Sequence, residues 1–257
     1  MSTQQDGEIP RIPSSHVRPG SSALKQIFRA PAALITDVAL TDDNSELLRI
    51  ARALGEIGDV VARPTRSAEL HGVYRVEALA NPVKDSLGTT VLSTSHEEFE
   101  LHSDHFFLEK VADYVLLQCW RCNDPKEYTC FASAKSICED LTDDAFHHLS
   151  TTPVMGGFGK RFILAGPRKN PTIFYNGYEI EKLSSRGRLT VPAVLHPYFK
   201  ELENAAKRCA VTVPVQPGDC LVMNNKRVLH GRRFISESSN RLLKRVRVHV
   251  TDPKYAS

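Results

Sequence analysis

The alternation of hydrophobic and polar positions predicts a chain of mainly short strands with helices beside them. Residues 24–40 contain an entry segment and a first strand, and "ADYVLLQCW" (112–120) is typical of a buried strand. Residues 241–250 alternate between apolar and polar side chains, which predicts a final strand. Apolar residues recur at helical spacing in 47–54. Residues 133–149 predict a helix start followed by a second helix that begins after Thr142, and residues 194–210 predict a further helix.

This order of elements favours one mainly β domain with flanking helices, built as a β-sandwich or barrel. The chain has 257 residues, enough for a single large domain, which we place at residues 26–257. Residues 1–25 are polar and rich in Pro, Ser and Gly, which predicts a flexible N-terminal arm. Residues 153–190 predict a hairpin and a mobile loop, and the glycines near residue 156 make 156–190 a lid candidate.

The composition argues against a membrane-spanning protein but excludes few other classes of protein. Hydrophobic residues make up 41% and charged residues 25%, which is ordinary for a globular protein. The net charge of +3 does not by itself argue for nucleic acid. No apolar run reaches the roughly 18 residues of a membrane helix, and the first residues lack the apolar core of a secretion signal. We therefore predict a cytoplasmic protein with reduced cysteines, including the two of "CWRC" (119–122).

The segment "LHSDHFF" carries the first candidate chemistry. In an extended H-x-D, His102 and Asp104 point to the same side of the chain. Two histidines and one carboxylate bind non-haem Fe(II) and leave three positions open. His230, at the end of a predicted strand, is a candidate third ligand. His105 cannot share the face of His102, so we interpret it as a structural or supporting residue. By itself an H-x-D is weak evidence, because a structural histidine is an equally simple interpretation.

Three arginines follow in the final predicted strand. Arg241, Arg245 and Arg247 are separated by even numbers of residues, so they share one face. A planar guanidinium suits bidentate binding of a carboxylate. The chain therefore offers a His/Asp pair, a distant histidine and then an anion-binding arginine, in that order.

Taken together, these segments resemble the taurine dioxygenase-like Fe(II)/2-oxoglutarate oxygenases. The resemblance implies a double-stranded β-helix, or jelly-roll, core, with iron held by His102, Asp104 and His230. It also implies that Arg241, eleven residues after the last ligand, grips the distal carboxylate of 2-oxoglutarate. Thr129 in "KEYTCFA" matches a threonine that helps to hold this cosubstrate, although the family often has "GGxT" there. The ending "RLLKR" is similar to the clavaminate synthase-like hydroxylases of free amino acids, which usually carry Glu at the position of Asp104.

The resemblance implies a dioxygenase that uses Fe(II), 2-oxoglutarate and O2. We expect it to hydroxylate an aliphatic C–H of a small, anionic, amino-acid-like substrate and to release succinate and CO2. Arg245 is then expected to bind the anionic group of the substrate, and Arg247 to lie at the solvent rim. We expect no membrane partner, and self-association stays open.

Two alternatives stay open. The spacing R-x5-R from Arg241 to Arg247 also fits the nucleic-acid demethylases of the AlkB type. The modest charge and the lack of a basic patch interleaved with aromatic residues disfavour this interpretation. The other alternative is a metal-binding β-barrel of cupin type or a non-catalytic binding module. A cupin would usually cluster its histidines in the sequence, whereas the candidate ligands here lie far apart.

Overall fold

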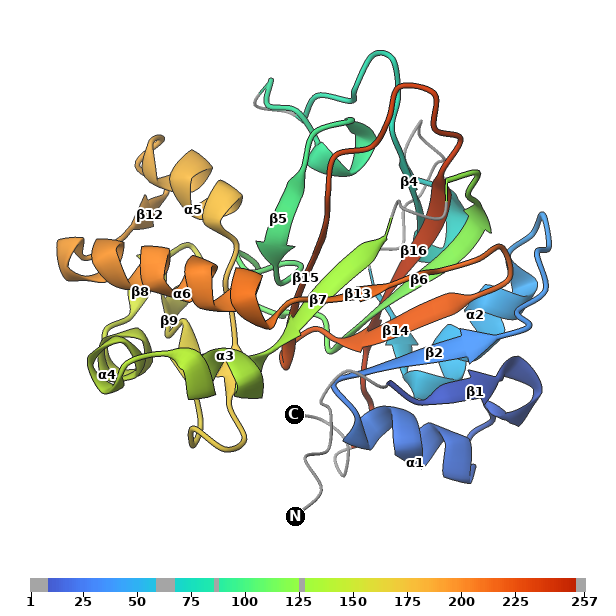
Figure 1. Ribbon diagram of the computed structural model, residues 1–257, viewed down its shortest axis with the longest axis horizontal. Helices are drawn as coiled ribbons and strands as arrows, with labels where there is room; N and C mark the ends of the chain where they lie inside the picture. Colours follow the sequence, from blue (N-terminus) through green and yellow to red (C-terminus); the bar gives the residue numbers. More distant parts are fainter. Residues whose placement is uncertain (1–8, 59–67, 86–87, 125–127, 253–257) are drawn as a thin grey trace.

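Two packed β-sheets form the centre of the computed structural model, which describes residues 9–58, 68–85, 88–124 and 128–252 (Figure 1). The larger sheet has the strand order β1-β2-β14-β6-β16-β3, with β4 also paired to β16, and the smaller has the order β13-β7-β15-β5. This arrangement confirms the mainly β jelly-roll core. The strands of the larger sheet are β1 (Arg11–Pro13), β2 (Ala32–Thr36), β3 (Glu56–Ile57), β4 (Val73–Glu77), β6 (Tyr114–Arg121), β14 (Cys220–Asn224) and β16 (Leu242–His249). Those of the smaller sheet are β5 (Phe99–His102), β7 (Thr129–Ser133), β13 (Val211–Val213) and β15 (Val228–Arg232).

Strand β6 shows how alternation builds two layers of core. Val115 and Leu117 face the smaller sheet and pack in one cluster with Phe131. Tyr114 and Leu116 point the other way and pack in a second cluster with buried residues of two helices. Successive side chains of a strand point to opposite faces, so a continuous apolar run such as β6 must be covered on both sides. The covering helices are α1 (Ser22–Arg29) and α2 (Ser45–Leu54).

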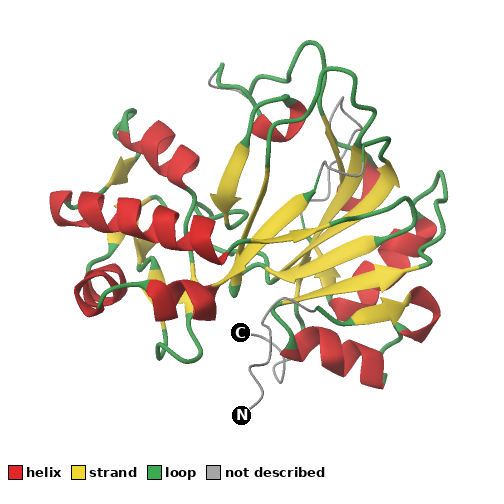
Figure 2. Cartoon of the chain, in the orientation of Figure 1, coloured by secondary structure: helices red, strands yellow, loops and turns green. Residues whose placement is uncertain are grey.

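The remaining helices form a separate lobe beside the sheets, on the left of Figure 1, and Figure 2 shows helices on both flanks of the strands. This lobe has its own apolar cluster. Its helices α3 and α4 begin where the sequence predicts, because the hydroxyls of Ser133 and Thr142 accept backbone N–H groups of the first turns. The helices are α3 (Ala134–Asp140), α4 (Asp143–Thr151), α5 (Gly177–Ser184) and α6 (His196–Cys209). The strands are β8 (Val154–Gly156), β9 (Gly159–Arg161), β10 (Leu164–Ala165), β11 (Thr172–Ile173) and β12 (Leu189–Thr190). Four 3-10 turns complete the described part of the chain, at Ser14–His16, Leu70–Gly72, Leu92–Thr94 and Ala193–Leu195.

The prediction of a flexible arm over residues 1–25 is wrong for its described part. Strand β1 pairs in parallel with β2, and Ile12 and Val17 are buried. The guanidinium of Arg49 on α2 donates hydrogen bonds to the backbone carbonyls of Ser14 and Val17. Two apolar anchors in a polar stretch are too few to show a period, so the sequence pattern could not reveal this packing. Residues 1–8 lie outside the described part of the chain.

The lid candidate at 156–190 contains more regular structure than the sequence indicated. The predicted hairpin is confirmed by β8 and β9, and Gly159, the first residue of β9, adopts a left-handed conformation (φ 82°). In place of a mobile loop the segment also forms α5, which begins where the Asn176 side chain accepts the N–H of Glu179. Within the described ranges, no helix combines the length and the apolar character needed to cross a bilayer. Cys119 is buried in the sheet core, as the interpretation of "CWRC" as part of a strand predicts.

Candidate metal and cosubstrate site

His102 and His230 meet as a directly opposed pair on two antiparallel strands. Strand β5 ends at His102, and the register of β5 and β15 places His230 across from it. Their ring centroids lie 4.6 Å apart. The strands approach closely at the next residue, because a side-chain carbon on Gly231 would lie only 2.4 Å from the carbonyl oxygen of Phe99. Strand pairing therefore unites two ligand candidates that are far apart in the sequence.

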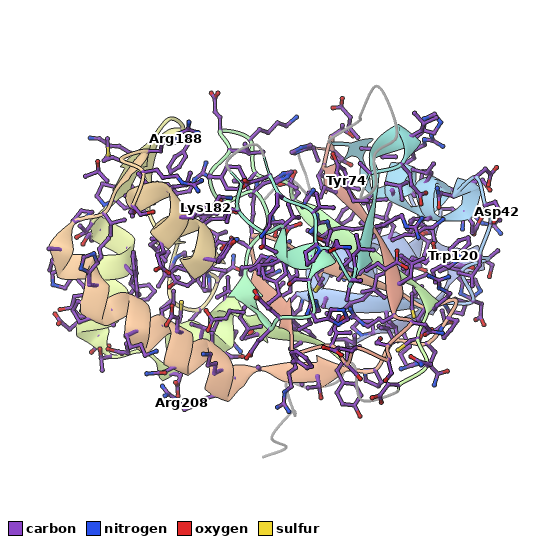
Figure 3. All side chains as sticks on the ribbon, turned by 90° about the horizontal axis from the view of Figure 1, so that it is seen from above. Asp42, Tyr74, Trp120, Lys182, Arg188 and Arg208 are labelled. Atoms are coloured by element: carbon purple, nitrogen blue, oxygen red, sulfur yellow. The ribbon has the colours of Figure 1, made fainter. Side chains whose placement is uncertain are left out.

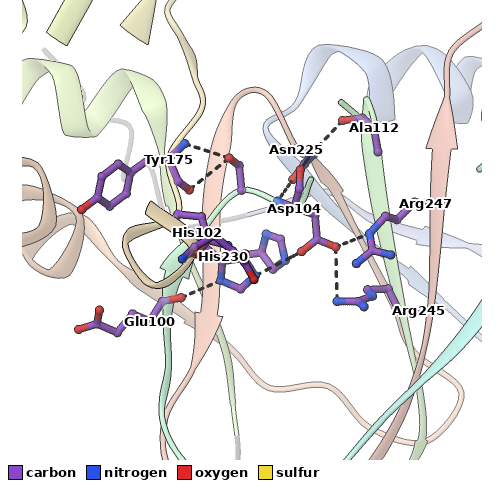
Figure 4. Close-up of polar contacts among 12 residues, drawn as sticks. Glu100, His102, Asp104, Ala112, Tyr175, Asn225, His230, Arg245 and Arg247 are labelled. Atoms are coloured by element: carbon purple, nitrogen blue, oxygen red, sulfur yellow. Dashed lines mark hydrogen bonds and ion pairs between the residues drawn. The ribbon is translucent and has the colours of Figure 1, made fainter. Parts of the chain in front are cut away.

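Asp104 completes this group from the turn after β5. Its Oδ1 lies 3.3 Å from Nε2 of His102 and 3.7 Å from Nε2 of His230 (Figure 4). All three residues are buried, and among the described residues they form a group whose potential ligand atoms lie within 4.8 Å of one another. The backbone of Asp104 is held by Asn225, whose Oδ1 accepts the N–H at 2.8 Å and whose Nδ2 donates to the carbonyl at 2.9 Å. The structure thus brings the three predicted ligands together.

The orientation of His102 fits a metal. Its Nδ1 donates a hydrogen bond to the carbonyl of Glu100 at 2.7 Å, so Nε2 carries the free electron pair. That Nε2 is buried and has no hydrogen-bond partner in the described structure. Leaving such an atom unsatisfied is costly, whereas a metal ion would use its electron pair. The ring of Phe99 stacks on the imidazole at 3.9 Å and fixes its plane. Two imidazoles and one carboxylate are the donor set of non-haem Fe(II), so the residues fit this ion.

Burial and charges around the group keep Asp104 and His230 in the form that binds metal. Burial opposes ionisation of Asp104, but the guanidinium groups of Arg247 and Arg245 outweigh it and hold the pKa of this carboxyl well below its usual range. Burial and the neighbouring His102 lower the pKa of His230 to about 3, so its imidazole is neutral at neutral pH. A carboxylate and neutral imidazoles are what a divalent metal requires.

The prediction that Arg247 lies at the solvent rim is wrong. Its side chain is buried, and its Nε donates to Oδ2 of Asp104 at 2.6 Å. Nη1 of Arg245 lies 3.4 Å from the same oxygen. Strand β16 runs between β6 and β4 inside the larger sheet. Its odd-numbered face points toward the smaller sheet, because Leu243 packs in one cluster with Phe131. The alternation places Arg245 and Arg247 on one face, but it does not say whether the strand is central or at an edge.

Arg241 and Thr129 meet beside the metal candidates. Nη2 of Arg241 donates to Oγ1 of Thr129 at 3.0 Å, and both residues are buried. They line a small cavity that His102, His230 and Arg245 also line. Thr129 opens β7 and Arg241 immediately precedes β16, so the two sheets contribute one residue each. A buried guanidinium and a hydroxyl in this cavity form a suitable site for a carboxylate.

A second cavity lies on the other side of the metal candidates. Asp104, His105 and Arg245 line it from the core, and Asn176 and Lys182 line it from the helical lobe. Figure 3 shows Lys182 and Arg188 on the side of this lobe and Tyr74 on the side of the sheets. His105 adopts a left-handed conformation (φ 62°) and lies outside the metal group, as its spacing from His102 predicts. Arg245 is notable because it lines both cavities.

Helix α5 and the residues just after it are joined to Asp85, Thr89 and Thr90 beside this second cavity. Nζ of Lys182 lies 2.9 Å from Oδ2 of Asp85, and the Tyr178 hydroxyl donates to the carbonyl of Thr90 at 3.0 Å. The guanidinium of Arg186 donates to Oγ1 of Thr89 at 2.8 Å. Sequence reasoning missed these contacts, because nothing in the pattern brings these three residues near 178–186.

Two supporting residues were also missed. Asn225 belongs to "NNK", which has the composition of a turn and shows no sign of holding the backbone of Asp104. Arg232 donates hydrogen bonds to the carbonyls of Leu92, Ser95 and Glu97 and so holds the segment that leads into β5. Its place in "HGRR", next to a candidate ligand, is the one signal that could have drawn attention to it.

Comparison with known proteins agrees with this geometry. The family model "Taurine catabolism dioxygenase TauD, TfdA family" matches residues 10–247. An L-lysine 3-hydroxylase of Catenulispora acidiphila is 27% identical over 188 residues, which cover 65% of this chain and 48% of that protein. The chain therefore spans about half the length of this curated relative.

Solved structures of two oxygenases share the fold. Asparagine oxygenase (AsnO) superposes with a TM-score of 0.68 at 16% identity, covering 89% of this chain and 77% of that one. The non-haem iron oxygenase OrfP, in complex with Fe, succinate and (3S)-hydroxy-L-Arg, gives a TM-score of 0.65 at 16% identity, covering 93% and 94%. At such identities these structures inform only the fold, whereas the family model spans most of the chain. The chain thus belongs to the TauD/TfdA family of dioxygenases.

Proposed function

We propose that the protein is an Fe(II)/2-oxoglutarate-dependent dioxygenase that hydroxylates an aliphatic C–H of a small, anionic, amino-acid-like molecule, with release of succinate and CO2. The observation that carries this proposal is the buried group of His102, Asp104 and His230 beside the cavity that ends at Arg241 and Thr129. A metal group alone would suit many functions. A metal group next to a buried arginine and threonine suits a cosubstrate that has both a chelating end and a distal carboxylate.

Each residue then has a defined task. His102, Asp104 and His230 would hold Fe(II), and Arg241 and Thr129 would bind the distal carboxylate of 2-oxoglutarate. Bound Fe(II) and 2-oxoglutarate together supply the activation of O2 that C–H hydroxylation requires. The apolar walls of the cosubstrate cavity, which include Val76, Leu117 and Leu243, exclude water from this chemistry.

Arg245 supports the substrate class. Its guanidinium lines the second cavity and suits a carboxylate of the substrate. The related proteins act on or bind amino acids: L-lysine for the 3-hydroxylase, hydroxyasparagine for AsnO and hydroxy-L-Arg for OrfP. We therefore propose a free amino acid or a close analogue as substrate, entering beneath α5, which would act as the lid. A cytoplasmic location also stays a prediction.

The modest net charge of +3 and the lack of a basic patch interleaved with aromatic residues argue against the AlkB-type alternative. A cupin-type barrel or a binding module would have no need for a buried arginine and threonine in the cavity that His102 and His230 also line. We therefore keep the small-molecule dioxygenase as the proposed function.

The test is a turnover assay with the whole protein, Fe(II), 2-oxoglutarate and a panel of L-amino acids. We expect at least one amino acid to stimulate succinate formation. Mass spectrometry should show that this amino acid has gained one oxygen atom, and the amount of oxygenated product should equal the amount of succinate. The variant His102→Ala serves as the negative control. Turnover of a methylated oligonucleotide instead would favour the AlkB-type alternative. Absence of 2-oxoglutarate-dependent O2 uptake with every compound would contradict the dioxygenase itself.

A further inference from the structure

The two carboxylate oxygens of Asp104 face different partners. Oδ1 faces the imidazoles, 3.3 Å from His102 Nε2 and 3.7 Å from His230 Nε2. Oδ2 faces the arginines and accepts a hydrogen bond from Nε of Arg247 at 2.6 Å (Figure 4). A charge-assisted hydrogen bond of this length in a buried site is strong. One oxygen is therefore engaged before any metal arrives.

The groups around this carboxylate restrict its rotation. Asn225 fixes the main chain of Asp104 on both sides of the residue. The guanidinium of Arg247 is buried and lies over the ring of Tyr74, 5.6 Å from its centroid. Tyr74 stands on β4, directly across from Arg245 in the pairing of β4 with β16. The donor is thus held by a central strand and an aromatic ring, and the acceptor by its backbone.

We propose that Arg247 is a positioning residue that keeps Oδ2 of Asp104 away from the metal, so that Asp104 binds the ion through Oδ1 alone. A carboxylate that binds through both oxygens would take an additional coordination position. Two histidines and one carboxylate oxygen leave three positions of an octahedron, enough for a chelating keto acid and O2. The inference rests on the proposed function for the ligand group, but it assigns a role to Arg247 that the function alone does not require.

Arg245 provides the comparison within the same site. It carries the same charge and faces the same oxygen, but its Nη1 lies 3.4 Å away and its side chain lines both cavities. If the site needed only positive charge near Asp104, loss of either arginine would have the same effect. If position matters, loss of Arg247 alone changes how Asp104 binds metal.

The test uses Co(II) as a spectroscopic probe in place of Fe(II), with the whole protein and no substrate. In Arg247→Met we expect the visible Co(II) spectrum to change and the affinity for 2-oxoglutarate to fall at least tenfold, because Oδ2 occupies a position that the cosubstrate needs. Arg247→Lys, which keeps a cationic donor, should restore a spectrum close to the wild type. Arg245→Met should leave the spectrum unchanged. Equal changes in the two methionine variants would overturn the proposal, as would an unchanged Arg247→Met.

A measurement on the wild-type protein shows whether Asp104 binds metal through one oxygen or two, even if Arg247→Met fails to fold. A crystal structure of the Co(II) complex should have Asp104 bound through one oxygen, with Arg247 on the other. Binding through both oxygens would overturn the proposal while leaving the dioxygenase function intact. Failure of the wild type to bind Co(II) at this site, by contrast, would remove the proposed function and this inference together.

Discussion

At the residue scale, we expect Arg241 to contribute most to binding of the cosubstrate. Arg241→Ala should weaken binding of 2-oxoglutarate strongly, because truncating one partner of a buried charged pair costs about 2–5 kcal/mol. Thr129→Ala should have a smaller effect of roughly 1 kcal/mol, since it removes only one hydroxyl group, which lies beside the guanidinium of Arg241. Calorimetric titration of 2-oxoglutarate into the metal-loaded protein measures both. An unchanged affinity in Arg241→Ala would count against the family-based role of this residue.

Arg245 is the residue that we expect to recognise the substrate. Arg245→Ala should raise the KM for the amino-acid substrate steeply and leave the KM for the cosubstrate nearly unchanged. The reason is that its guanidinium is the group best placed in the second cavity to meet a substrate carboxylate. Steady-state kinetics with each compound varied in turn supplies the pair of constants. A parallel rise of both would assign Arg245 to the cosubstrate site, because it also lines that cavity.

Residue spacing predicted much of this site, and its limits are instructive. H-x-D and a distant histidine identified three residues that the structure brings together. The family resemblance added Arg241, which lines the same cavity as the two histidines. The same reasoning put Arg247 at the rim, because a spacing of two gives a shared face and says nothing about depth. Depth depends on how many strands lie on either side of β16, which is a non-local property.

At the element scale, Lys182 joins α5 to Asp85 over the second cavity. Lys182→Met should increase hydrogen exchange in residues 177–184 about tenfold, because a mostly buried charge-assisted hydrogen bond contributes about 1.5–3 kcal/mol. Mass spectrometry of the exchanged protein measures this. Lys200→Met on α6 is the matched control, since Lys200 is 70% exposed and its nearest acidic partner is 3.6 Å away. Equal exchange in the two variants would show that Lys182 does not hold α5 in place.

The pairing of β5 with β15 depends on Gly231. Gly231→Ala would place a carbon 2.4 Å from the carbonyl oxygen of Phe99, and the strands must separate to accept it. We expect a destabilisation of about 1–3 kcal/mol and weaker metal binding, because His102 and His230 face each other through this pairing. Denaturant unfolding and Co(II) titration measure the two effects. Gly157→Ala is the control, since its added carbon meets no atom within 4 Å. If Gly231→Ala bound metal as tightly as the wild type, the metal site would tolerate separation of β5 from β15.

At the scale of the whole molecule, metal binding should stabilise the fold. The three ligands come from β5, the following turn and β15, so the unfolded chain has no preformed site. At a free metal concentration of about 100 times Kd the stabilisation is about 2.7 kcal/mol, and a chelator should remove it. Thermal unfolding under anaerobic conditions with Fe(II) measures the shift in Tm. Replacement of a ligand by alanine should abolish both this shift in Tm and turnover, which we expect of His102→Ala, Asp104→Ala and His230→Ala. If one of these variants retains both, the residue it replaces is not a metal ligand.

The sequence by itself determined a mainly β domain with flanking helices and most of its main strands and helices, because these follow from local backbone periods that a linear chain carries without any knowledge of its contacts. The jelly-roll class, the complete ligand set and the cosubstrate residues Arg241 and Thr129 came from the resemblance of the sequence motifs to a known family. Only the tertiary structure decided that residues 11–25 pack on the core, that α5 covers a cavity and that Arg247 holds Asp104. Each of these depends on which distant segments become neighbours, because burial and partner choice result from the register of paired strands and not from the period of any one of them.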